Sequence, residues 1–138
     1  MVRQALYALN AHPTFLRWMM GRHVYSDAVH ITPELMQAKH QTTQAKEARF
    51  ASVAFVTGGL DPVQQRTDWL DLMQVVTVPK LVIVGQQSPP KSKAEMEMLS
   101  AMTGVESAIA PGSLGLGEEY SEKALAFLLP FLAQHLVD

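Results

Sequence analysis

The stretch VPKLVIVG, residues 78–85, decides the fold class of this chain. Its continuous apolar run, which ends in glycine, is typical of a strand covered on both faces, as in a parallel sheet. Residues 105–110 predict a second strand, which is less hydrophobic and is therefore expected nearer an edge. Between them, Ser92 and Glu95 have the spacing of a capping box and predict a helix that ends at Gly104. Strand, helix and strand together predict a right-handed parallel β-α-β unit.

The segments on both sides of this unit are predicted to be helical. Residues 1–74 contain short helical pieces separated by proline and glycine. Thr32-Pro33 and Asp61-Pro62 are helix-start signals, because the first side chain caps free amides and proline has none to lose. Another helix is expected over residues 47–56, and a last one from Ser121 onward, with a kink at Pro130. The leucines of this last helix that we expect to be buried are Leu125, Leu128, Leu129, Leu132 and Leu136. The predicted fold is therefore α/β, with a helical N-terminal half followed by a parallel β-α-β-α unit.

The composition excludes several classes of protein. A chain of 138 residues predicts one domain, and its net charge of -2 without a basic stripe argues against nucleic-acid binding. The absence of cysteine excludes disulfides and thiol catalysis and fits a reducing cytoplasm, where we expect the protein. The apolar runs fall far short of the roughly 20 residues that a membrane span needs. Residues 1–11 do not resemble a secretion signal.

No metal or cofactor is predicted. The five histidines lack the spacing of a metal site and are interpreted as surface or capping residues. They are His12, His23, His30, His40 and His135.

The glycine-rich turn APGSLGLGEEYSEKAL, residues 110–125, invites two chemical interpretations. As a nucleophile elbow around Ser113 it fails, because Pro111 replaces the first glycine and residues 114–117 continue as a loop. As a phosphate loop it matches no nucleotide fingerprint, and Glu118 and Glu119 would occupy the place of the phosphate. Ser113 is therefore interpreted as a turn serine that hydrogen-bonds local backbone.

Several short motifs, taken in order, resemble the cap-bearing branch of the α/β-hydrolase fold family. They are FVTGGLDP at 55–62, VPKLVIVG at 78–85, Pro111-Gly112-Ser113, Glu118-Glu119 and the final Phe131-Leu132. The resemblance covers nearly the whole chain but only the later part of a family domain. It implies one partial domain over residues 1–138, with cap-like helices at 1–60 and a C-terminal sheet-helix unit at 61–138. The two strands resemble the family's seventh and eighth, and the strand that carries the nucleophile has no counterpart here.

The same resemblance implies where the catalytic acid and histidine would fall. The acid position is occupied by Ser88 and the histidine position by Leu114, or by Gly117 if the alignment slips. Leucine and glycine cannot accept a proton from a nucleophile, and serine cannot stabilise an imidazolium as a carboxylate does. The chain is thus predicted to contain no catalytic residue and to have no independent hydrolase activity.

An apolar pocket beneath the cap-like helices is a weaker prediction. Its candidate lining residues are Trp18, Met19, Phe55 and Met73, because methionine and aromatic side chains suit an adaptable apolar site. Packing between helices is the preferred interpretation of the same residues.

A sheet of two strands has two open edges, so we expect another polypeptide to complete it. That polypeptide is a second copy related by a twofold axis, or a separately encoded N-terminal half; a truncated or split reading frame is a third interpretation. The function predicted from the sequence is assembly, or binding of a small apolar molecule. The alternative is a subunit of a split, esterase-like hydrolase that supplies cap and pocket to a partner carrying the nucleophile.

Overall fold

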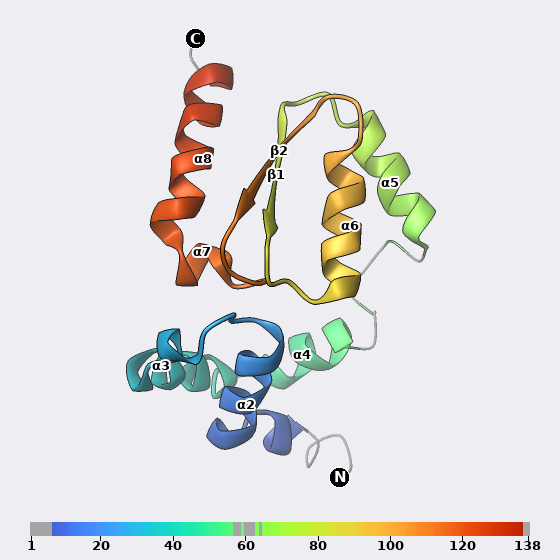
Figure 1. The fold of residues 1–138 in the computed structure, drawn as a ribbon. Helices are drawn as coiled ribbons and strands as arrows, with labels where there is room; N and C mark the ends of the chain where they lie inside the picture. The colour runs from blue at the N-terminus through green and yellow to red at the C-terminus, as the bar shows by residue number, and fades with distance from the viewer. Residues whose placement is uncertain (1–6, 57–58, 60–62, 64, 137–138) are drawn as a thin grey trace.

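The computed structural model describes residues 7–56, 59, 63 and 65–136 (Figure 1). Helices from the first half of the chain gather at one end, and an α/β unit stands above them (Figure 1). The predicted mixture of helices with a parallel sheet is confirmed at this level.

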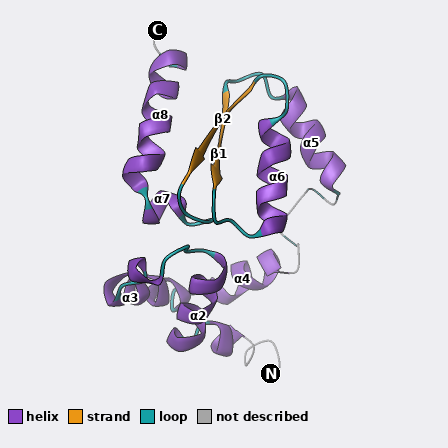
Figure 2. Cartoon of the chain, viewed as in Figure 1, coloured by secondary structure: helices purple, strands orange, loops and turns teal. Residues whose placement is uncertain are grey.

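The sheet has two parallel strands, β1 (Lys80–Gly85) and β2 (Val105–Ala110). Their register pairs Lys80 with Val105 and Gly85 with Ala110. The connecting helix α6 (Pro90–Ser100) lies on one side of the sheet, and α8 (Ser121–His135) lies on the other (Figure 2). A short helix, α7 (Leu116–Glu119), leads into α8, and α5 (Arg66–Val75) precedes β1 on the outer side of α6 (Figure 2).

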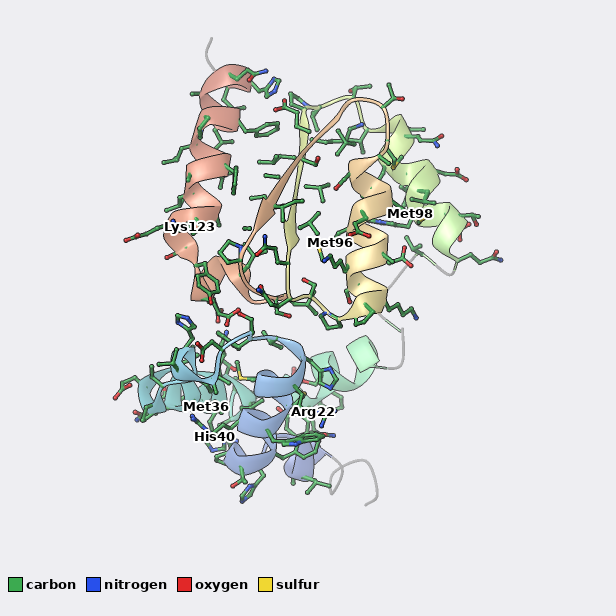
Figure 3. All side chains as sticks on the ribbon, in the orientation of Figure 1. Arg22, Met36, His40, Met96, Met98 and Lys123 are labelled. Atoms are coloured by element: carbon green, nitrogen blue, oxygen red, sulfur yellow. The ribbon has the colours of Figure 1, made fainter. Side chains whose placement is uncertain are left out.

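The helical end contains α2 (Pro13–His23), the 3₁₀ turn η1 (Ala28–His30), α3 (Pro33–Thr43) and α4 (Ala48–Val56). The predicted start of α3 is confirmed, since the Leu35 amide donates to Thr32 Oγ1 at 3.2 Å and Pro33 follows. A small core joins α2, α3 and the segment between them through the side chains of Met20, Tyr25, Ile31 and Met36. Figure 3 shows Met36 inside this helical end.

Of two further predicted helix starts, one differs from the structure and one lies outside the described residues. The capping box at Ser92 and Glu95 is wrong, because α6 already begins at Pro90 and both residues lie inside the helix. Proline at the first helical position, which is pre-organised for a helix, sets this start. The start predicted at Asp61-Pro62 lies outside the described residues. Helix α5 instead begins at Arg66, after the Gln65 amide donates to Asp68 Oδ2 at 3.2 Å.

The burial predicted for the leucines of α8 is wrong for four of the five. Leu125 is 44% exposed, Leu129 58% and Leu136 70%, while Leu128 is at the margin and Leu132 is half-buried. A sheet of two strands is too narrow to cover the full apolar arc of this helix. The apolar face of α8 is therefore wider than the surface that the described chain packs against it.

No helix in the described part of the chain combines the length and the apolar character needed to cross a membrane.

Candidate functional site

The turns that follow the two strands meet at the carboxyl end of the sheet. The Gln86 amide donates to the carbonyl of Ala110 at 2.9 Å, and the Gln87 amide donates to that of Gly112 at 2.9 Å. A second hydrogen bond joins the same two residues, because Gln87 Oε1 accepts from the Gly112 amide at 2.6 Å. Ligand sites of parallel sheets lie at this end of the strands, so the two turns form the candidate functional site.

Ser88 and Leu114, the two positions implied by the resemblance, both lie in these turns. Ser88 is buried, and its hydroxyl has no hydrogen-bond partner among the described residues. Leu114 is 50% exposed. The site thus presents one buried hydroxyl and one outward apolar side chain, and neither can act as a general base.

Gly85 explains how the two turns approach so closely. A Cβ atom on Gly85 would lie 2.7 Å from Ser88 Oγ, 2.8 Å from the carbonyl oxygen of Gly112 and 2.9 Å from that of Ser113. Real side chains do not make such contacts, so only glycine fits at the end of β1.

Ser113 is buried and has no nucleophile-base pair. It is 3% exposed, and its amide contacts Glu119 Oε2 at 3.4 Å. Within the described hydrogen bonds, no histidine is paired with a serine hydroxyl. The geometry of an activated serine is therefore not present in this part of the chain.

Glu119 is the residue of the site that sequence reasoning missed. We expected it to face the positive end of a helix, but its buried carboxylate reaches the segment between α2 and η1. There Oε1 accepts from the Ser26 amide at 2.7 Å, from the Asp27 amide at 3.0 Å and from Ser26 Oγ at 3.1 Å. The sequence gives no signal for these partners, because they lie more than ninety residues away. These hydrogen bonds satisfy the buried carboxylate, which thereby connects the helical end to the turn after β2.

Glu118 forms a second contact between the same two parts. It accepts from Lys39 Nζ at 2.6 Å and from the Tyr25 hydroxyl. The hydrogen bond from Lys39, followed by that from Tyr25, lowers the pKa of Glu118 below its usual value. Burial, together with the neighbouring Glu118, raises the pKa of Tyr25 well above its usual range, so this phenol stays neutral and donates.

Among the described pocket candidates, Met73 is not brought together with Trp18 and Met19. Trp18 is 54% exposed on α2, where it contacts Phe15 and the guanidinium of Arg22. Met19 packs against the small core of the helical end. Met73 belongs to α5, a helix that lies apart from α2 (Figure 1). The side chain of Phe55, in α4, lies outside the described residues.

A cavity of about 380 Å³ lies instead at the amino ends of the strands. Its polar lining includes Glu106 and His135, whose Oε1 and Nε2 atoms are 2.6 Å apart, and Lys80, whose Nζ donates to carbonyls at the end of α5. These polar groups are paired with one another or with backbone. The described residues contain no cluster of three or more His, Cys, Asp or Glu side chains that could hold a metal ion.

The fold is a small α/β unit that is hydrogen-bonded to a helical end through Glu118 and Glu119. Its described strand-end turns contain no acid-base pair. No family model, curated protein or solved structure matches this chain.

Proposed function

We propose that this chain is an α/β-hydrolase-like module that acts by assembly and is not catalytic alone. It contributes cap-like helices and two parallel strands to a larger sheet, which another polypeptide completes.

The observation that carries this proposal is the exposed apolar surface of the described residues. None of their large side chains is completely buried, and many large apolar side chains among them are exposed.

Much of the exposed apolar surface lies around the sheet. Leu125, Leu129 and Leu136 are exposed at α8, and Ile109 is exposed on β2. On α5 and the segment after it, the exposed apolar side chains include Trp69, Leu72, Val75 and Val78. Helices α6 and α8 pack on the two sides of the sheet, but these large apolar side chains stay exposed around it. This distribution supports a role in which the sheet and its helices pack against further protein.

The strand-end turns support the non-catalytic part of the proposal. The position that should carry a base holds Leu114, and the nearest buried carboxylate, Glu119, already accepts several hydrogen bonds. Because Trp18 and Met73 lie in different parts of the molecule, assembly is favoured over binding of an apolar ligand beneath the cap-like helices.

Sedimentation velocity over a range of micromolar concentrations, combined with amide hydrogen exchange, tests the assembly. We expect a species larger than the monomer and protected amides in residues 81–84. A monodisperse monomer with the same amides protected would contradict the proposal, because the sheet would then be stable without a partner.

Hydrolysis of short nitrophenyl esters tests the absence of independent catalysis. We expect no turnover above the background rate. Turnover that disappears in a Ser113→Ala variant would overturn this part of the proposal, because it would assign a nucleophile to the chain.

A further inference from the structure

The outer edge of β2 has an open row of backbone groups. Since the Gln86 amide donates to the carbonyl of Ala110, position 110 of β2 points its backbone toward β1. In a parallel ladder the direction alternates, so the amide and carbonyl groups of Ser107 and Ile109 point away from β1. Both residues are exposed, and Ile109 is 63% exposed.

The side chains at this edge divide between the two faces of the sheet. Glu106 contacts His135 of α8, so residues 106, 108 and 110 face α8. Val105, Ser107 and Ile109 therefore face the side of α6. Helix α6 packs more against β1 than against β2, and Ser107 and Ile109 stay exposed on this face of β2.

We propose that two copies of this chain pair through their β2 strands, antiparallel across a twofold axis, with Ser107 opposite Ser107 of the second copy. This inference rests on the proposed function, since it names the polypeptide that completes the sheet. The resulting sheet has four strands in the order β1, β2, β2 and β1.

The sequence of β2 is self-complementary in this register. Val105 lies opposite Ile109 on the α6 side of the sheet, so the exposed isoleucine gains an apolar cross-strand partner. The two Ser107 residues form a hydrogen-bonded pair through their backbones at the centre. Glu106 lies opposite Ala108 on the α8 face, so no like charges meet.

The neighbouring registers are less favourable. Only every second residue points its backbone groups outward, and these residues must face one another in the pairing. The twofold axis therefore passes beside a residue, either Ser107 or one of its neighbours, and never between two residues. Centring on Glu106 places two carboxylates directly opposite each other, which is destabilising. Centring on Ala108 places Val105 opposite Pro111, which has no amide to donate. The register centred on Ser107 avoids both costs.

A single cysteine introduced at Ser107 reports this register, because the chain contains no other thiol. The two Cα atoms of a central hydrogen-bonded pair are about 5.5 Å apart, which is within the range of a disulfide. Two Ala108 residues would be diagonal neighbours with their Cα atoms about 8 Å apart, which is beyond that range. We expect Ser107→Cys to form a covalent dimer under mild oxidation. Ala108→Cys and Lys123→Cys, whose side chain projects from α8 away from the sheet (Figure 3), are matched controls and should stay uncrosslinked.

A charge at Ile109 supplies an independent test. Because this side chain is exposed in the single chain, Ile109→Lys should leave the fold intact, as judged by circular dichroism, and should convert the assembly to monomer in sedimentation velocity. Val29→Lys is the matched control, since Val29 is 70% exposed at the helical end and should leave the assembly unchanged.

The outcomes separate this inference from the proposed function. An assembly that survives Ile109→Lys and gives no disulfide at Ser107 overturns pairing through β2 but leaves assembly standing. A wild-type monomer with unprotected amides in residues 81–84 overturns the second copy as partner, while a different partner remains compatible. A wild-type monomer with those amides protected overturns both.

Discussion

At the scale of single residues, Gly85 is the tightest point of the site. Replacing it by alanine forces a Cβ atom to within 2.9 Å of three oxygen atoms, two of which belong to the backbone and cannot turn aside. We expect Gly85→Ala to lower the free energy of unfolding by about 1–3 kcal/mol, measured by urea denaturation.

Gly117 provides the matched control. It lies in α7, where a Cβ atom would meet nothing within 4 Å. Gly117→Ala should be neutral or slightly stabilising, since alanine favours a helix over glycine. Equal stability of Gly85→Ala and the wild type would mean that the two turns are not held as closely as described.

The contact between Glu118 and Lys39 predicts a pH-dependent contribution to stability. The pKa of Glu118 in the folded chain lies below its usual value of 4.5, so the folded state favours the ionised carboxylate. This contribution is present above the unfolded pKa and is lost as pH falls through the folded pKa. We expect Glu118→Gln to be less stable than the wild type at neutral pH, with the difference closing in urea denaturation as pH falls through the lowered pKa of Glu118. Glu97→Gln, exposed on α6, should show no such convergence; a Glu118→Gln deficit that is constant with pH would contradict the ionic explanation.

At the scale of elements, the sequence predicts what depends on local signals. The strands at residues 80–85 and 105–110 follow from apolar runs that end in small residues, and the start of α3 follows from Thr32-Pro33. The start of α6 was misjudged because two signals compete there: a serine-glutamate spacing and a proline pair. Proline prevailed, since its fixed φ is pre-organised for the first turn of a helix.

The parts of the site that the sequence did not predict depend on distant contacts. The turns that carry Ser88 and Leu114 could be placed from the order of strands and helices, because the ends of parallel strands meet at one edge. The role of Glu119 could not, because its partners at Ser26 and Asp27 are backbone amides that almost any residue supplies. The exposure of Leu129 likewise depends on the width of the sheet, which the leucine spacing of α8 does not reveal.

Helix α8 continues through Pro130, which is exposed within it. Proline inside a helix removes one hydrogen bond, here the one that the carbonyl of Ala126 would accept, and its ring crowds the preceding turn. Alanine restores the donor. We expect Pro130→Ala to raise the free energy of unfolding by as much as about 3 kcal/mol in urea denaturation. A less stable variant would show that the bend expected at Pro130 is needed for α8 to pack on the sheet.

At the scale of the whole molecule, folding and association should be linked. The described chain has no large side chain that is completely buried, and its apolar surface extends over α8, β2 and α5. If that surface is buried only in the assembly, the partner binds the folded chain and not the unfolded one, so mass action stabilises the fold as concentration rises. For a dimer of this length, the thermal midpoint should increase by roughly 2 °C for each tenfold increase in protein concentration. Differential scanning calorimetry over two decades of concentration measures this slope, with Val29→Lys expected to keep it and Ile109→Lys to lose it. A midpoint that does not change with concentration in the wild type would mean that the chain holds its fold alone, because a monomer gains nothing from mass action.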